Sequence, residues 1–194
     1  SMEGLPEKQP KRVYINYFHG IDQPKVTALM GVITQLYTKE RPDELYFLFS
    51  SGGGDVASGI VLYHFLKALN TRVIMHNTGT IDSIATVIFM AGETRYASRN
   101  STFLFHGVQM GVGAGKSFSL GQLQELVSRL TDDQNKIAGI IADRCKLTQE
   151  EMEKLFVRGE SKNLEFAKEK GIIHEIRDPE IPKDATLITI NFQA

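Results

Sequence analysis

Five consecutive apolar residues, Leu45 to Phe49, form the segment that most restricts what this chain can fold into. A strand of that composition is buried on both faces, which is typical of a parallel sheet covered by helices. Segments with strand-like and helix-like patterns alternate along the rest of the chain. Such alternation predicts right-handed crossover connections and a mostly parallel sheet. We therefore predict an α/β fold, with a single domain over residues 12–194.

Hydrophobic spacing and turn residues place the individual elements. Strands are predicted at residues 12–17, 45–49, 72–76, 100–106 and 172–176, with an edge strand at 187–192. Helices are predicted after Pro24, at about 56–70, at 84–91, at about 120–144, after Thr148 and at 164–170. Residues 1–11 are rich in lysine, glutamate and proline and are predicted to be disordered, with Ser1-Met2 as a remnant of cloning.

The stretch from Gly79 to Ala85 joins a predicted strand to an apolar segment that ends at Gly92. Alanine, methionine and the closing glycine favour a helix for that segment. Ser83 then lies where the strand turns into the helix, and the amide of Ile84 is one of the free N–H groups of the first turn. This arrangement places a hydroxyl nucleophile beside a donor that suits an oxyanion. The simpler interpretation is a serine that only caps the helix.

Two further features follow predicted strands. The glycine turn Gly52-Gly53-Gly54 follows one strand, and His106 ends another. Ligands of parallel sheets bind at the carboxyl ends of the strands, so these features and Ser83 are predicted to form one site. In that site His106 would take the proton of Ser83 as a general base. Amides of Gly53 and Gly54 would face a developing oxyanion, and the missing side chains let a substrate backbone approach closely.

Each of these features also has a simpler explanation. A run of three glycines is commonly only a turn, and a histidine at a strand end is commonly structural. Phosphate binding at the glycine turn is disfavoured, because neither dinucleotide-binding spacing nor a following Gly-Lys-Ser/Thr is present.

Four ordered motifs resemble those of the ClpP family of serine peptidases. Residues 51–59, Ser-Gly-Gly-Gly-Asp-Val-Ala-Ser-Gly, are similar to its Ser-Pro-Gly-Gly-Asp-Val-x-x-Gly turn. Residues 79–85 resemble its Gly-x-x-x-Ser-Met-Ala nucleophile turn. Residues 92–106 are similar to its Gly-x-x-x-Arg, Pro-Asn-Ser and Met-Ile-His segments, and residues 171–176 to its Gly-Leu-Val-Asp-x-Ile ending. The resemblance covers residues 12–177.

This resemblance implies a ClpP/crotonase-like spiral of ββα units, with the helix at 120–144 projecting from the body. It also implies a serine endopeptidase that cleaves unfolded or short polypeptides through an acyl-enzyme. Members of the family assemble into rings, commonly heptamers stacked in pairs, around an enclosed chamber. By this resemblance Ser83 is the nucleophile and His106 is the base. The amides of Gly54 and Ile84 form the oxyanion hole. Gly53, Gly111 and Gly113 lie beside the bound peptide, which is held as an added strand.

The sequence departs from the family pattern in four places. Gly52 replaces the usual proline, and Asp82 precedes the serine where the family has a small residue. The orienting aspartate of the family aligns with Gly159 when the C-terminal motif is matched. A one-residue shift brings Glu160 there, and we name Glu160 as the predicted orienting acid. Only about 11 residues precede the first predicted strand, which argues against coupling to an ATPase unfoldase.

Three other functions fit parts of the sequence. A Ser-Lys enzyme of the signal-peptide-peptidase type would use Lys136 or Lys116 as its base. A catalytically impaired scaffold subunit would explain Asp82 and the missing aspartate. A crotonase-like acyl-CoA enzyme would use the same glycine turn, but it has no need of the pair Ser83 and His106.

Composition excludes several other classes. A net charge of −1 provides no field for nucleic acid or an anionic membrane, and no apolar run reaches the ~18 residues of a membrane span. The polar N-terminal segment predicts no signal peptide. The lone Cys145 excludes an internal disulfide, so a cytoplasmic location is predicted. The five histidines lack metal-ligand spacing, and neither a metal nor another cofactor is predicted.

Overall fold

The computed structural model describes residue 4 and residues 8–192. Ser1-Met2 and most of the segment predicted to be disordered lie outside the described residues. The elements in chain order are β1 Arg12–Phe18, α1 Gln23–Lys39, β2 Glu44–Ser51, α2 Val56–Ala68, β3 Arg72–Asp82, α3 Ile84–Phe89, β4 Thr94–Ala97, β5 Thr102–Leu104, α4 Leu120–Ala142, α5 Gln149–Arg158, β6 Ser161–Lys162, α6 Leu164–Glu169, β7 Glu175–Ile176 and β8 Thr186–Thr189.

The mostly parallel sheet that the alternating pattern predicts is confirmed. Its main path runs β6-β5-β3-β2-β1-β8, and among the described strands only β5 and β6 pair antiparallel. The long strand β3 has two partners on one side: its residues 74–77 pair with β4, and its residues 80–82 pair with β5. Because β2, β3 and β5 run in the same direction, their carboxyl ends meet at one edge of the sheet.

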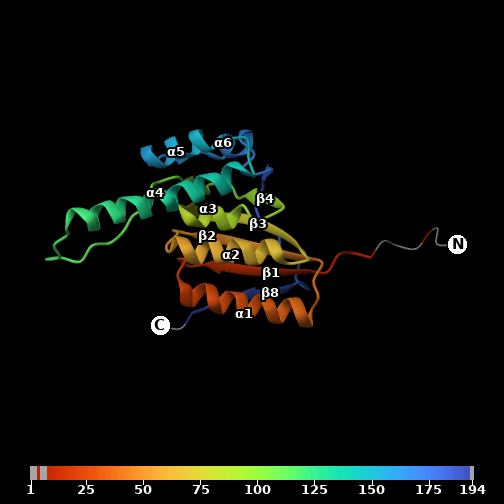
Figure 1. Ribbon diagram of the computed structural model, residues 1–194. Helices are drawn as coiled ribbons and strands as arrows, with labels where there is room; N and C mark the ends of the chain where they lie inside the picture. The colour runs from red at the N-terminus through yellow and green to blue at the C-terminus, as the bar shows by residue number, and fades with distance from the viewer. Residues whose placement is uncertain (1–3, 5–7, 193–194) are drawn as a thin grey trace.

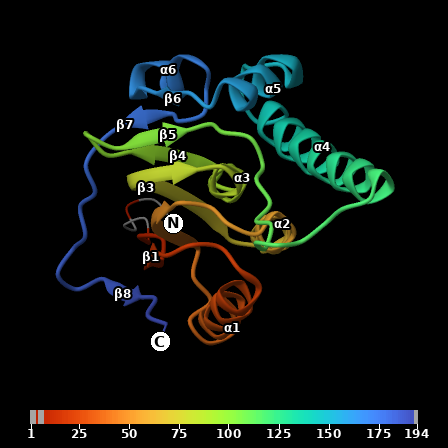
Figure 2. The same ribbon diagram turned by 90° about the vertical axis from the view of Figure 1, so that its left-hand side faces the viewer.

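Helices α1, α2 and α3 cover one face of this sheet (Figure 2). All eight residues of β2 are buried, which confirms the two-sided burial that its composition predicts. Alternate residues of β2 belong to different clusters: Phe47 and Phe49 join the main core, whereas Tyr46 and Leu48 join a smaller cluster on the opposite face. The chain between β7 and β8 runs along that opposite face, where Ala185 packs against the smaller cluster.

Three strands, β5, β7 and β8, are shorter than the sequence predicts, and the short strands β4 and β6 were not predicted at all. β5 ends at Leu104, because the chain then leaves the sheet and carries His106 to the turn after β3. β7 begins only at Glu175, because the preceding carbonyl groups accept hydrogen bonds from Arg95 rather than from a strand. Arg95 itself lies within β4 and interrupts its apolar pattern.

Arg95 is 4% exposed and ties three helix ends together. Its guanidinium donates to carbonyl groups that follow α3, α4 and α6, namely those of Gly92, Arg144, Gly171 and Ile172. Carbonyl groups at a helix C-terminus lack helical partners and carry partial negative charge, so they stabilise the buried cation. Desolvation, with a smaller effect from nearby Arg144, lowers the pKa of Arg95 to about 10. The side chain therefore stays charged at neutral pH.

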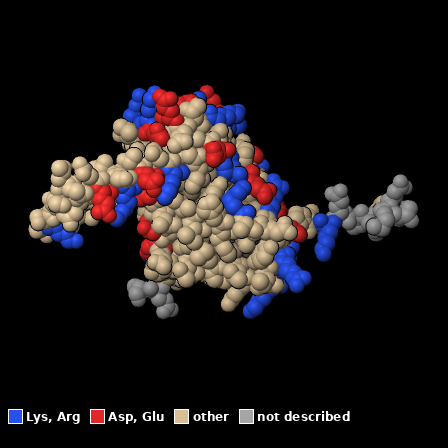
Figure 3. Space-filling model, in the orientation of Figure 1, with Lys and Arg blue, Asp and Glu red and all other residues tan. Residues whose placement is uncertain are grey.

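Helix α4 and the segment before it extend beyond the rest of the molecule, as expected for the helix at 120–144 (Figure 1). Ser119 caps the helix in a capping box with Gln122. The helix is buried only near its C-terminal end, and apolar side chains nearer its start are 48–72% exposed: Leu120, Leu123 and Val127. Much of this projection is uncharged (Figure 3). Within the described part of the chain, no helix is both long and apolar enough to span a membrane.

Candidate active site

Three bends of the backbone meet at the carboxyl edge of the sheet. They are the glycine turn after β2, the turn at Ser83 between β3 and α3, and the segment after β5 that carries His106. Together they line a small cavity of about 230 Å³. The structure therefore brings Ser83, His106 and Gly54 to one site, as the strand ends predict. Gly52, Val56, Val108 and Gln109 complete the lining.

Ser83 has an unusual backbone conformation. Its φ of 53° and ψ of −125° lie outside the regions that residues with a side chain usually occupy. Its N–H donates to the carbonyl of Leu104 at 3.3 Å, which ties the turn to β5. The Ser83 hydroxyl makes no capping hydrogen bond to α3, and the residue is only 8% exposed. The simple helix-cap interpretation therefore does not describe this serine.

The glycine turn is shaped so that only glycine fits at two positions. A Cβ at Gly53 would lie 2.8 Å from the carbonyl oxygen of Asp82, and a Cβ at Gly54 would lie 2.1 Å from that of Ile21. Both glycines also have positive φ, 85° and 150°. Among the residues that the structure describes, neither the N–H of Gly54 nor that of Ile84 has an acceptor. Gly54 lines the cavity with Ser83, and Ile84 is the next residue in the chain, so two N–H groups without an acceptor belong to the turns that meet here.

The protonation of the His106 ring follows from its hydrogen bond. Nδ1 lies 3.1 Å from the carbonyl oxygen of Gly107, and a carbonyl can only accept, so Nδ1 carries the proton. In the neutral ring Nε2 is then bare and can accept a proton. No hydrogen bond between His106 and Ser83 is present among the described residues. Catalytic hydrogen bonds are often long without substrate and shorten when it binds.

Glu160 has its carboxylate engaged away from His106. It forms ion pairs with Lys162 at 2.5 Å and with Arg158 at 3.8 Å, and the bond from Lys162 holds the pKa of Glu160 below its usual value. The backbone of this region does reach the histidine. A Cβ built on Gly159 would lie 3.9 Å from the Cβ of His106. The structure therefore places a residue without a side chain next to the Cβ of His106, while the Glu160 carboxylate bonds to Lys162 instead.

The segment after His106 contributes other residues than those named from the sequence. Gly111 and Gly113 are exposed and do not line the cavity, whereas Val108 and Gln109 do. Val56, the first residue of α2, was likewise not singled out. Val56, Val108 and Gln109 could have been found only from their closeness in sequence to the glycine turn or to His106. Neither valine nor glutamine at these positions suggests a chemical role.

Asp82 and the two candidate lysines also lie apart from the cavity. The Asp82 carboxylate accepts a hydrogen bond from the Thr80 hydroxyl, so it is held by its own strand rather than by the Ser83 turn. Lys136 forms an ion pair with Asp132 at 2.8 Å on the exposed side of α4. Lys116 packs under Gly113 in the segment that precedes α4. Neither lysine lines the Ser83 cavity.

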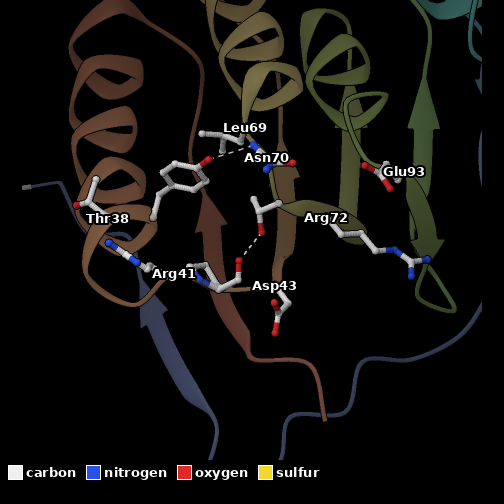
Figure 4. A pocket seen from close by; sticks show the side chains of 10 residues that line it. Thr38, Arg41, Asp43, Leu69, Asn70, Arg72 and Glu93 are labelled. Carbon is white, nitrogen blue, oxygen red and sulfur yellow. Dashed lines mark hydrogen bonds between the residues drawn. The ribbon is translucent and has the colours of Figure 1, made fainter. Parts of the chain in front are cut away.

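A larger hollow of about 680 Å³ lies at the opposite edge of the sheet, near the starts of β2, β3 and β4 (Figure 4). It is lined mainly by polar residues, and some of their side chains bond to backbone groups. Thr71 donates to the carbonyl of Pro42 at 2.7 Å, and the Tyr37 hydroxyl accepts the N–H of Asn70 at 3.3 Å. The hollow contains none of the candidate catalytic residues. Within the described residues, no group of three or more His, Cys, Asp or Glu side chains is placed to hold a metal ion.

Three comparisons relate this chain to known proteins. The family model described as Clp protease matches residues 9–180. The ATP-dependent Clp protease proteolytic subunit 2 of Pseudomonas aeruginosa is 26% identical over 136 residues, which are 69% of this chain and 66%, just under two thirds, of that relative. A solved structure of a ClpP1 variant from Listeria monocytogenes has a TM-score of 0.72 and 20% identity, over 87% of this chain and 92% of that chain. The last comparison establishes a shared α/β fold.

Proposed function

Because this chain belongs to the Clp protease family, we propose that it is a serine endopeptidase that acts through an acyl-enzyme on Ser83. One observation carries the proposal: an uncapped serine, an imidazole with a bare nitrogen and a turn with a free amide line a single small cavity. Each group comes from a different bend of the chain. Nucleophile, base and oxyanion donors within reach of one carbonyl group are what acyl transfer needs.

The groups act in a defined order. The Ser83 hydroxyl attacks the carbonyl carbon of the peptide while His106 Nε2 takes its proton. The negative charge that develops on the carbonyl oxygen is met by the amides of Gly54 and Ile84. The imidazolium then gives its proton to the leaving nitrogen as the peptide bond breaks, which leaves the acyl-enzyme. His106 then takes a proton from water as the water attacks the ester carbonyl. The imidazolium gives that proton to the Ser83 oxygen as the ester bond breaks, which releases the acid product and restores Ser83 and neutral His106.

We assign the orientation of His106 to the carbonyl of Gly107 rather than to Glu160. The carbonyl fixes the tautomer that leaves Nε2 bare. It carries no full negative charge, however, so it stabilises the imidazolium less than a carboxylate would. The proposed enzyme is therefore a Ser-His dyad. Glu160 would serve only if its carboxylate left Lys162.

A covalent serine probe tests this function directly. We expect a fluorophosphonate to modify the intact protein once, and peptide mass spectrometry to find the label on Ser83. Ser83→Ala serves as the negative control. Folded wild-type protein that remains unlabelled at millimolar probe would contradict the peptidase and favour the scaffold subunit.

The same proposal includes self-association into a ring around the active sites. The exposed apolar residues at the start of α4, Leu120, Leu123 and Val127, give the projection a surface suited to a second copy. We expect light scattering to find particles several times the chain mass of 21.7 kDa. An ATPase partner would dock on such a ring. A protein that stays monomeric at micromolar concentration would therefore contradict both the ring and its docking to an ATPase.

A further inference from the structure

The glycine turn that carries the proposed oxyanion hole is held by Ile21, which lies just after β1. The N–H of Ile21 donates to the carbonyl of Gly53 at 2.9 Å, and the carbonyl of Ile21 accepts the N–H of Asp55 at 2.8 Å. These two bonds form an isolated parallel bridge between Ile21 and Gly54. Along an extended chain, successive N–H groups point to opposite sides. Because residues 53 and 55 bond to Ile21, the N–H of Gly54 points away from it.

The position of Ile21 depends on the two residues before it. The Tyr17 hydroxyl donates to the carbonyl of Gly20 at 2.6 Å. Gly20 lies next to the glycine turn, since a Cβ built on it would be 3.4 Å from the carbonyl oxygen of Gly53, an ordinary contact distance. The His19 ring packs edge-on against Tyr17, with 5.2 Å between ring centroids. The segment from His19 to Ile21 is therefore fixed from its β1 side.

On its other side His19 is held by the C-terminal segment of the chain. His19 Nε2 donates to the carbonyl of Ile190 at 2.8 Å, and its ring packs edge-on against Phe192 with 4.6 Å between centroids. The segment is in turn anchored to β1, because β8 pairs with β1 and the N–H of Ile190 donates to the carbonyl of Asn16 at 2.9 Å. Figure 2 shows β8 lying beside β1, close to the end of the chain.

We propose that His19 is a positioning residue for the oxyanion hole, and that residues 186–192 hold it in place. His19 does not touch the substrate. It links the C-terminal segment to Ile21, and Ile21 sets the direction of the Gly54 amide. This inference rests on the proposed function, since the amide matters for catalysis only if Ser83 is acylated. A small displacement of an oxyanion-hole N–H group lowers the reaction rate strongly, because its hydrogen bond to the developing oxyanion depends on the direction of the N–H group.

The effect on catalysis is measured by labelling Ser83 at several fluorophosphonate concentrations, which separates probe affinity from the maximal labelling rate. We expect His19→Ala to lower the maximal rate about tenfold with affinity within about twofold of the wild type. His19→Gln should restore most of the rate, because its side-chain amide can donate to the Ile190 carbonyl. His64→Ala, which alters an exposed histidine on α2, should leave both values unchanged. Equal losses of rate in the Ala and Gln variants, or no loss in either, would overturn the proposal.

A second measurement does not depend on activity. Amide hydrogen exchange, read by mass spectrometry, should quicken at least tenfold at Ile21 and Asp55 in His19→Ala, and less than twofold in His19→Gln. If the wild-type protein is never labelled at Ser83, the proposed function is wrong. Faster exchange in His19→Ala would still support the conclusion that His19 holds Ile21 and the glycine turn in place. Unchanged exchange at both amides in His19→Ala would show that His19 does not hold the turn.

Discussion

Replacing His106 with alanine should lower the rate of fluorophosphonate labelling at Ser83 by about 10²–10⁴-fold. The expectation follows from the tautomer: Nδ1 donates to Gly107, so Nε2 is the only ring nitrogen able to take the serine proton. That loss corresponds to about 3–5 kcal/mol of transition-state stabilisation. The measurement is the second-order labelling rate constant of purified His106→Ala, with circular dichroism to establish that the variant is folded.

Lys136→Ala and Lys116→Ala are the matched comparisons for this experiment. Both lysines were candidate bases from the sequence, and both lie outside the cavity. Each variant should label within about twofold of the wild type, as expected for surface substitutions that leave the site intact. A Ser-Lys enzyme would give the reverse pattern, with labelling retained in His106→Ala and lost in one lysine variant.

Gly159→Asp should raise the rate of fluorophosphonate labelling at Ser83 by at least about tenfold. Gly159 lies at the end of α5 with φ 63° and ψ 44°, a left-handed conformation that aspartate and asparagine tolerate better than other side chains. A side chain there would start 3.9 Å from the Cβ of His106. Its carboxylate could replace the Gly107 carbonyl as the acceptor for Nδ1–H and stabilise the imidazolium, an effect worth up to ~10⁴-fold in a complete triad.

Gly159→Asn separates charge from shape in this test. It has nearly the same size and the same tolerance for positive φ, but it adds no negative charge. We expect Gly159→Asn to label no faster than the wild type. If the Asp variant is folded and also no faster, or if the Asn variant gains equally, then a carboxylate at this position does not act on His106.

The edge of the sheet that carries the candidate site could be predicted from the sequence, because its position depends on strand direction. Once β2, β3 and β5 are recognised as parallel, their carboxyl ends must meet, and the residues after them must share a site. Ser83, His106 and Gly54 follow from that rule. Burial of β2 on both faces was equally predictable, since five apolar residues in a row leave no face for solvent.

Other features depended on particular contacts, local or distant, that no residue pattern indicates. The hydrogen bond that fixes the His106 tautomer comes from the next residue's carbonyl, and no residue type in the sequence signals it. Glu160 was named by alignment, but a salt bridge with Lys162, two residues further on, takes its carboxylate. The link from Ile190 to His19 spans 171 positions. Such a contact arises from chain topology, and local periodicity contains no information about it.

The placement of β8 also has a consequence for handling the protein. β8 pairs with residues 13–16 of β1 and so occupies the flank of a seven-residue strand that would otherwise be open. An open strand flank offers unpaired N–H and C=O groups to any other extended chain, and it is a common starting point for precipitation. The four residues of β8 give the sheet a shorter and more polar border, with threonine at each end. Shortened forms of the chain should therefore retain the residues up to Phe192 to remain well dispersed.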